Sequence, residues 1–463
     1  MDPIKLNYRN LVSPRNSLGV RNQDLRGVLG DRFKKAMVAV DARRSAGDFG
    51  FFELPYSEEL SREASTLAES FRKRFSDLAV IGIGGSALGV RTLRDALLGL
   101  DWNKRSSEQR DGYPRLHVLE NPDPKSLVTL FSSMDPSKTL FCVVSKSGQT
   151  LETLAQYLVA RDWIASSVGE DNATEHFLFI TDPNHGPLRY IAQTEEVLTL
   201  PIPENVGGRF SVLSPAGLFP AALCGIDIES LLCGAAMMDG RCKTHELTEN
   251  PAGILATLLY QAHIQNGQKI HVLMPYADRL RSASQWFQQL WAESLGKSSS
   301  SGEKDQGIPA PTPLVALGAI DQHSLLQLFM EGPRDKVVIF IKVEDSNLPV
   351  LIPDLHPDLS ELSCLAGHTI GELLVAEWRA TAEALSRVGC PNATIHLPAI
   401  EANIMGQLLM MLQISTVIAA ELYGVDPLGQ PGVELGKKLT RALISGERSE
   451  MEEAEESELK WLV

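Results

Sequence analysis

Cysteines are few in this sequence, and their spacing does not suggest a shared site. The six cysteines among 463 residues lack CxxC spacing, which argues against a structural zinc site and against a disulfide framework. Most of them fall inside apolar runs, so we expect buried free thiols in a protein of a reducing compartment. They are Cys142, Cys224, Cys233, Cys242, Cys364 and Cys390.

Basic residues are also fewer than acidic ones. The chain has 43 lysines and arginines against 58 aspartates and glutamates, which gives a formal net charge of −15. Nucleic acids and anionic membranes bind broad cationic surfaces, so neither is an expected partner. A small anionic ligand would need a few local cations to attract it against the overall field.

Long apolar segments are missing as well. We find no uninterrupted apolar run of transmembrane length, and the first ten residues, MDPIKLNYRN, lack the apolar core of a signal peptide. We therefore expect a cytoplasmic protein. The length is sufficient for two or three domains, each with its own core.

The chain does contain a regular alternation of apolar strands and helices, which indicates parallel sheets covered on both faces. The pattern becomes mainly helical after Gly208 and then resumes, so we predict two α/β domains, 46–235 and 236–425. A helical extension over 1–45 and a helical arm with an acidic tail over 426–463 complete the prediction. Strands are expected at 77–85, 115–120, 139–145, 176–182, 269–276, 313–319, 336–344 and 393–399.

A helix is expected over 285–297, QWFQQLWAESLGK, and it carries a candidate proton-transfer group. Gln289 and Glu293 share a helical face because they are four residues apart. Large apolar side chains surround them in the sequence, and a carboxylate held against indole rings would be a suitable general base near neutral pH. The alternative is an amphipathic helix whose glutamate faces water.

A glycine-rich turn follows the first strong strand. Gly82, Gly84, Gly85 and Ser86 open a helix, where backbone N–H groups can bind an anion. The spacing also satisfies a dinucleotide-binding fingerprint, so an NAD-dependent dehydrogenase is an alternative. The acid which that fingerprint requires would be Glu120, after a long polar insert. A tight turn without a ligand remains a third interpretation.

A second turn combines hydroxyl groups with a cation. Ser145, Lys146, Ser147 and Thr150 follow the apolar strand 139–145 and precede a helix. Several donors and one positive charge suit a phosphate monoester, although serine and threonine are also ordinary N-caps. Two such turns in one parallel unit favour a phosphorylated small molecule over a pyrophosphate.

Three further residues are candidates only in combination. Arg209 follows a glycine pair and could stabilise an oxyanion, or could be a structural arginine paired with a carboxylate. His323 at a helix start would alone be a surface or capping residue, and Lys437 would alone be an ordinary helix lysine. No histidine shows metal-ligand spacing.

Taken together, these segments resemble the phosphoglucose isomerase (glucose-6-phosphate isomerase) family from about Leu78 to Lys438. ENVGGRFSVLSPAG and GQPGVELGK resemble its two signature motifs, and the other matching segments occur in the family's order: IGIGGSALG, SKSGQTLET, QQLWAES and the DQH segment. The resemblance implies an α/β fold of two doubly wound parallel-sheet sugar-isomerase (SIS) domains with helical N- and C-terminal extensions. It implies reversible isomerisation of glucose 6-phosphate and fructose 6-phosphate through an enediolate.

The resemblance also implies roles for individual residues. Glu293 matches the catalytic base, His323 and Lys437 the ring-opening groups, and Arg209 the enediolate stabiliser. The substrate contacts are the phosphate-binding residues Gly85, Ser86, Ser145, Lys146, Ser147 and Thr150 and the polar residues Gln289 and Gln430. No metal or other cofactor is expected, and the expected assembly is a homodimer with shared active sites.

The sequence departs from the family pattern at one point. Leu428 and Gly429 precede Gln430, where the family usually has an aromatic residue and an aspartate, which predicts a looser loop. We further expect a mobile surface loop in the polar segment 298–311, and a solvated or frayed helix in the acidic tail 447–458. A non-catalytic sugar-phosphate sensor is the alternative to an enzyme; it would keep the phosphate turns and could lose the base.

Overall fold

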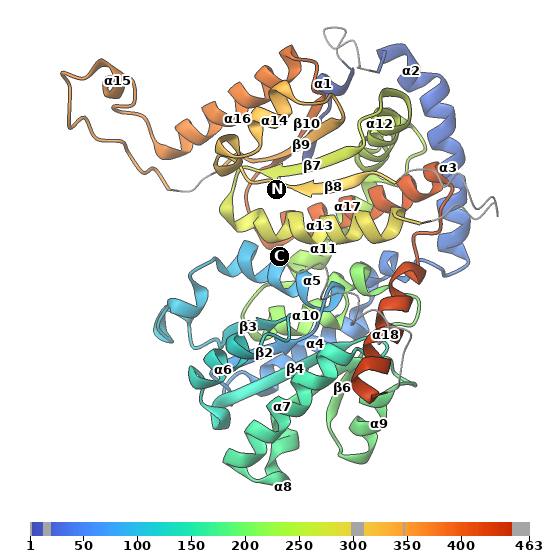
Figure 1. The fold of residues 1–463 in the computed structure, drawn as a ribbon, viewed down its shortest axis with the longest axis vertical. Coiled ribbons are helices and arrows are strands. Elements are labelled where there is room, and N and C mark those ends of the chain that lie inside the picture. The colour runs from blue at the N-terminus through green and yellow to red at the C-terminus, as the bar shows by residue number, and fades with distance from the viewer. Residues whose placement is uncertain (1, 13–19, 298–309, 346–347, 447–463) are drawn as a thin grey trace, which may run out of the picture.

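The computed structural model describes residues 2–12, 20–297, 310–345 and 348–446. The molecule contains two five-stranded sheets, one at each end, with several helices between them (Figure 1). The predicted polar loop, except for its last two residues, and the predicted helical tail fall outside the described residues. The predicted α/β class with parallel sheets is confirmed.

The first sheet is parallel throughout, in the order β3-β2-β4-β5-β6. Its central strands β2, β4 and β5 are buried along their whole length, which explains their almost continuous apolar sequence. The strands are β2 (Asp77–Ile81), β3 (Arg115–Leu119), β4 (Thr139–Ser145), β5 (Phe177–Thr181) and β6 (Leu198–Pro201).

Helices cover both faces of this sheet, because alternate residues of each strand face opposite sides. Phe141 and Val143 pack with residues of α6, α7 and α9, whereas Leu140 and Cys142 belong to a second core that includes α4, α5 and α10. The helices of this unit are α4 (Glu58–Phe71), α5 (Gly85–Leu93), α6 (Pro124–Ser132), α7 (Leu151–Val168), α8 (Glu170–Ala173), α9 (Pro187–Thr194) and α10 (Pro215–Leu223).

The second sheet has the order β1-β10-β9-β7-β8, and only its edge strand β1 is antiparallel. β1 comes from the N-terminal segment that the sequence predicts to be helical. That segment therefore supplies a strand to the second sheet as well as three helices. The strands are β1 (Lys5–Asn7), β7 (Ile270–Pro275), β8 (Thr312–Val315), β9 (Lys336–Val343) and β10 (Asn392–Leu397); the N-terminal helices are α1 (Arg9–Val12), α2 (Asn22–Arg26) and α3 (Val28–Ser45).

The helices of the second half include those that join the two sheets. One face of the second sheet packs on α14 and α16, and the other belongs to the largest core cluster, which also contains residues of the first sheet. The predicted domain limit at 235/236 lies inside α11. The helices are α11 (Ile228–Arg241), α12 (Pro251–Asn266), α13 (Arg281–Leu295), α14 (Leu326–Glu331), α15 (Ser360–Ser363), α16 (Ile370–Arg387), α17 (Ala402–Tyr423) and α18 (Glu434–Ser445).

Helix α17 is the centre of this shared core. By length and hydropathy it could cross a membrane, but 94% of its most apolar window is buried inside the protein. It packs against α11, α12, α13 and α3. Its apolar circumference is therefore satisfied within the chain.

The six cysteines are free in the structure, and their burial differs. Cys142, Cys224, Cys242 and Cys390 are buried, as expected, and burial raises the pKa of the Cys390 thiol to about 11. Cys233 is exposed, and so is Cys364, just after α15. The expectation of burial is wrong for these two residues. Cys233 lies on the outer surface of α11, and Cys364 follows the short helix α15.

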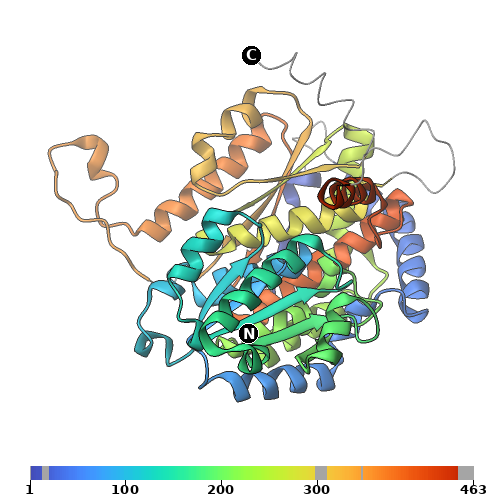
Figure 2. The same ribbon diagram turned by 60° about the horizontal axis from the view of Figure 1, so that its bottom comes forward.

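Residues 348–369 form an arm that projects from the second unit (Figures 1 and 2). Its two ends are joined by an antiparallel bridge between Leu351 and Thr369, and α15 lies near its tip. Several of its apolar side chains are exposed in the single chain, including Leu348 and Leu355 at 72% each. The sequence does not predict this arm.

Candidate active site

Helix α13, with the candidate base, packs against α5 of the first unit. Helix α5 begins at Gly85, immediately after strand β2 and its glycine turn. Because parallel strands end at one edge of a sheet, the turns after β2 and β4 leave the first sheet side by side. This edge faces α13, so residues from both units meet there (Figure 1).

Two glycines allow the close approach. A Cβ atom at Gly85 would lie 2.3 Å from the carbonyl carbon of Gly208, and one at Gly84 would lie 2.7 Å from Nε2 of Gln289. Gly84 also has a φ of +58°, which a residue with a side chain rarely adopts. The glycine turn therefore brings the Arg209 backbone and helix α13 to the start of α5.

Arg209 links several parts of the site through its hydrogen bonds. It lies at the start of η8 (Gly208–Leu213), and its side chain is 5% exposed. Its Nη1 is 3.2 Å from Oε2 of Glu293, and its Nε donates to Oγ of Ser294 at 2.8 Å. Burial lowers the pKa of this guanidinium, and the charge of Glu293 opposes that shift. Arg209 is therefore a buried cation that remains paired with the candidate base.

Glu293 is held by polar groups on both carboxylate oxygens. Oε2 is bound by Arg209, and Oε1 accepts a hydrogen bond from Nε2 of Gln289 at 2.9 Å. The Glu293 side chain is 30% exposed, whereas Trp286 and Trp291 of the same helix are buried in the core. The guanidinium and the amide, rather than the indole rings that the sequence suggested, position Glu293.

Gln289 has one polar atom left for another partner. Its Oε1 is buried and accepts no hydrogen bond from any described residue. A buried acceptor without a donor is costly, so such atoms commonly face a ligand or water. This geometry suits the polar substrate contact that the sequence suggested for Gln289.

The loop before α18 is also bound by Arg209. Arg209 Nη2 donates to the carbonyl oxygens of Pro427 and Gly429, the latter at 3.1 Å. Lys297 Nζ donates to the carbonyls of Asp426 and Leu428. Four consecutive carbonyls are thus bound by two cations, so the loop expected to be loose is anchored directly before Gln430.

Lys297 and Ser294 are site residues that the sequence did not predict, although both lie near Glu293 in the QQLWAES segment or just after it. Burial lowers the pKa of Lys297 to about 8, and the nearby charge of Arg209 adds to that effect. The available signal was the helical spacing of Lys297 from Glu293. Its partners could not be predicted, because they lie about 130 residues further along the chain.

The hydroxyl-rich turn follows β4 as expected. Ser145 is buried, and its Oγ is 2.9 Å from Oγ1 of Thr150, the N-cap residue of α7. Ser147 is exposed, and Lys146 donates from Nζ to the carbonyl of Glu204 at 2.7 Å. Burial lowers the pKa of Lys146. The turn therefore places hydroxyls and one ammonium group at a helix N-terminus, which is favourable for a phosphate.

Ser86 lies in the first turn of α5 and is partly exposed. A Cβ at the preceding Gly82 would contact Ser86 Cβ at 3.0 Å and the carbonyl of Val144 at 3.2 Å. The two turns predicted to bind an anion are therefore neighbours. Glu120, the acid that a dinucleotide site would require, is instead ion-paired with Arg91 of α5.

The remaining candidates stand apart from Glu293 in the single chain. His323 is exposed at the end of η11 (Ile320–His323), and Lys437 pairs with Glu434 at 2.8 Å on the exposed helix α18. Gln430 is exposed beside the anchored loop. Neither His323 nor Lys437 contacts the pair of Glu293 and Arg209 within the described part of the chain. The residues that the structure describes contain no group of three or more His, Cys, Asp or Glu able to hold a metal ion.

Comparisons with known proteins agree over most of the chain. The family model described as Phosphoglucose isomerase matches residues 64–460. A glucose-6-phosphate isomerase from Carboxydothermus hydrogenoformans is 40% identical over 461 residues, which is 99% of this chain and 98% of that protein. A second, from Rubrobacter xylanophilus, is 43% identical and covers 85% of this chain and 88% of that protein.

Solved structures show the same fold. The crystal structure of a hypothetical protein from Thermus thermophilus has a TM-score of 0.84 at 36% identity and covers 95% of this chain and 99% of its own. A glucose-6-phosphate isomerase from Chlamydia trachomatis has a TM-score of 0.72 at 24% identity, covering 88% of this chain and 77% of that one.

Proposed function

The chain belongs to the phosphoglucose isomerase family, and we propose that the family's reaction takes place around Glu293, Arg209 and Gln289. The reaction is the reversible isomerisation of glucose 6-phosphate and fructose 6-phosphate. It requires ring opening, proton transfer between adjacent carbons and stabilisation of the enediolate between them. The observation that carries the proposal is a partly exposed carboxylate fixed between a buried guanidinium and a buried amide.

Glu293 transfers the carbon-bound proton. In the direction from aldose to ketose it removes the proton from C2, the electron pair forms the enediolate, the hydroxyl proton passes from O2 to O1, and the carbon-bound proton returns to C1. Its two hydrogen bonds keep the carboxylate in one position, which is what a general base needs. Its exposed part leaves room for the sugar carbons.

Arg209 stabilises the charge that develops on the sugar oxygen. Its guanidinium is fixed by four protein groups before substrate binds, so little reorganisation is required during the reaction. The buried Oε1 of Gln289 accepts a hydrogen bond from a sugar hydroxyl. Gln430, directly after the anchored loop, supplies a second polar contact.

The two turns beside α5 and α7 bind the phosphate group. Ser86, Ser145, Ser147 and Thr150 supply hydroxyls, Gly85 supplies a backbone N–H, and Lys146 supplies the local positive charge. The charge matters because the chain as a whole carries −15. His323 and Lys437 act at ring opening, once they are brought to the site.

The direct test of this function is a coupled assay for glucose 6-phosphate formed from fructose 6-phosphate, run with and without a chelator. Turnover that the chelator leaves unchanged supports the proposed acid–base mechanism. Binding of fructose 6-phosphate without turnover would instead support the non-catalytic sensor. That alternative is not favoured, because relatives that match nearly the whole chain are named as isomerases.

We expect the double variant Ser147→Ala/Thr150→Ala to weaken phosphosugar binding much more than turnover. Each hydroxyl supplies a hydrogen bond to a charged phosphate worth roughly 1.5 to 3 kcal/mol, which corresponds to about tenfold to a hundredfold in affinity. KM and the inhibition constant of inorganic phosphate measure the effect. Ser132→Ala/Thr194→Ala, two exposed hydroxyls elsewhere, is the control. Unchanged phosphate affinity would remove this turn from the site.

We expect Lys297→Met to lower kcat/KM by roughly tenfold to a hundredfold, because the loop before Gln430 loses its bonds from a charged donor. Methionine keeps the length and apolar stem of lysine, so the unfolding midpoint should change little. Steady-state kinetics and a thermal melt distinguish the two effects. Lys125→Met on the exposed start of α6 is the control, and wild-type kinetics of Lys297→Met would show that Arg209 alone holds the loop.

The proposed active assembly is a cytoplasmic homodimer with shared sites. The burial of α17 leaves that helix unavailable for an interface, but the 348–369 arm and α18 expose apolar side chains in the single chain. Leu435 and Ile444 of α18 are 67% and 76% exposed. A second copy of the chain would cover such residues, and it could bring His323 to the site of its neighbour.

A further inference from the structure

A hollow lies at the opposite edge of the first sheet from the turns proposed to bind phosphate. Its volume is about 550 Å³, within the usual range for small-molecule sites. It is lined by the end of α4 and the turn after it, by the loop around η5 (Glu108–Arg110), and by Lys138 just before β4. The seven residues of β4 separate Lys138 from the Lys146 turn by roughly 20 Å.

This hollow is strongly basic, although the chain is acidic overall. Five cations line it against two carboxylates, Glu69 and Asp111, in a protein whose net charge is −15. Cations gathered from three separate stretches repel one another unless an anion lies between them. The cationic lining residues are Arg72, Lys73, Arg74, Arg110 and Lys138. We call this hollow the basic pocket.

Arg110 is the most informative of these cations. It is 6% exposed, and it donates to two backbone carbonyls, that of Tyr113 at 3.1 Å and that of Arg105. It forms no ion pair with a carboxylate in the part of the chain that the structure describes. Buried arginines are rarely left without an anionic partner, so the charge of Arg110 is available to a bound anion.

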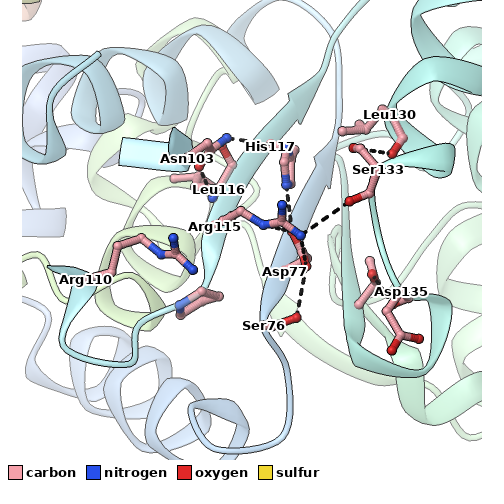
Figure 3. Close-up of polar contacts among 12 residues, drawn as sticks. Ser76, Asp77, Asn103, Arg110, Arg115, Leu116, His117, Leu130, Ser133 and Asp135 are labelled. Atoms are coloured by element: carbon pink, nitrogen blue, oxygen red, sulfur yellow. Dashed lines mark hydrogen bonds and ion pairs between the residues drawn. The ribbon is translucent and has the colours of Figure 1, made fainter. Parts of the chain in front are cut away.

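The buried carboxylate whose charge acts on Arg110 already has other partners. Asp77, the first residue of β2, is bound by Arg115 through both oxygens, at 2.7 and 2.8 Å, and by Ser76 and His117 (Figure 3). Burial acts to raise the pKa of Asp77, but the hydrogen bonds from His117 and Arg115 outweigh it and lower that pKa. Asp77 is therefore ionised and hydrogen-bonded to Arg115, and its charge acts on Arg110 only at a distance, without an ion pair.

The other cations of the basic pocket are only weakly paired. Arg74 bonds Glu175 at 2.7 Å, but both side chains are about half exposed, and such pairs contribute little. Arg72 lies 3.6 Å from Glu69, and its guanidinium lies 4.2 Å from the ring centre of Tyr113. Lys73 and Lys138 are exposed and form no ion pair with a described residue. Flexible lysines beside a fixed arginine can adapt to an anion.

We propose that the basic pocket binds a small polyanion, a compound with two or more phosphate or carboxylate groups, separately from the isomerase site. Arg110 forms the fixed contact at the base, Lys73 and Lys138 close over the ligand, and the hydroxyls of Ser76 and Ser107 lie in the same lining. The pocket is independent of the residues assigned to isomerisation, so this binding does not depend on the proposed function.

The test uses inorganic pyrophosphate and citrate as probes in calorimetric titrations of the full-length protein. Saturating fructose 6-phosphate keeps the isomerase site occupied, so that only other sites are measured. We expect about one probe molecule to bind per chain, with an affinity that falls as salt rises. Binding of either probe supports the pocket, and their relative affinities tell phosphate from carboxylate recognition.

Two charge-reversal variants locate the binding. Lys73→Glu/Lys138→Glu should weaken probe binding at least about tenfold without a loss of kcat, because neither lysine belongs to the isomerase site. Lys35→Glu/Lys125→Glu changes the net charge equally at exposed positions elsewhere and should bind the probe as wild type. Equal weakening in both variants would show a general charge effect and overturn the proposal.

Arg110→Gln tests the buried contact. If the variant gives a wild-type circular dichroism spectrum, it should bind neither probe. If it does not fold, the lysine variants still decide the question, because their side chains are exposed. Failure of both probes to bind the wild-type protein under saturating fructose 6-phosphate would also overturn the proposal.

Discussion

Replacing Glu293 with glutamine is expected to lower kcat for the isomerisation by about a hundredfold to ten-thousandfold, the range typical of a lost general base. The expected KM stays close to that of the wild-type enzyme. Glutamine has nearly the same shape as glutamate but cannot accept the carbon-bound proton. The effect should therefore appear in the chemical step and not in binding.

The local contacts explain why this variant should remain intact. The amide oxygen of the introduced glutamine can still accept from Arg209. Its amide nitrogen would face the Nε2 donor of Gln289, but Gln289 can rotate its amide, because its Oε1 has no partner among the described residues. After that rotation the sugar hydroxyl can accept a hydrogen bond from Nε2 of Gln289 instead of donating to Oε1. Both contacts of the side chain at position 293 are thus kept. The glutamine variant is a cleaner test than alanine, which would leave Arg209 without a charged or polar partner at this position.

The measurement needs two readouts and one control. Initial rates give kcat and KM, and equilibrium binding of fructose 6-phosphate to the variant shows that the site is still formed. Glu59→Gln, an exposed glutamate on α4, should keep wild-type kinetics. If Glu293→Gln retains more than about a tenth of wild-type kcat, the proton is transferred by another group.

Apolar strand runs were sufficient to predict most of the fold. Strands such as β2 and β4 are buried along their length, and their sequences are almost continuously apolar, so their position was predictable. Strand β1 was missed because Lys5–Asn7 has three residues, two of them polar, and its pairing partner β10 lies at the other end of the chain. Short edge strands have almost no local signal.

The candidate site was also predictable only in part. The Ser145–Thr150 turn was predictable because its residue types and spacing are local. The anchoring of Asp426 to Gly429 by Arg209 and Lys297 was not, because it depends on the packing of α13 against the first unit. The arm at 348–369 was also missed, since its exposed apolar residues follow no helical or strand period.

His323 and Lys437 pose the remaining structural question, because both lie exposed and apart from Glu293 in the single chain. The proposed dimer answers it for His323, if each site takes that residue from the neighbouring subunit. The arm and α18 are the surfaces that a second chain would cover. A shared site makes a prediction that no arrangement within one chain can reproduce.

Mixing His323→Ala subunits with Glu293→Gln subunits, each inactive alone, is expected to restore activity. In a heterodimer, one site combines Glu293 of the first chain with His323 of the second and is intact, while the other site lacks both. Random exchange of equal amounts makes half of the dimers heterodimers, so activity should approach about a quarter of wild type. The rise should follow the rate of subunit exchange, measured in parallel by fluorescence transfer between labelled chains.

A Glu293→Gln/His323→Ala double variant mixed with His323→Ala is the control, and it should stay inactive, because no heterodimer then contains an intact His323. A mixture of the two single variants that exchanges subunits but stays inactive would place His323 in the site of its own chain, as would a fully active monomer in sedimentation.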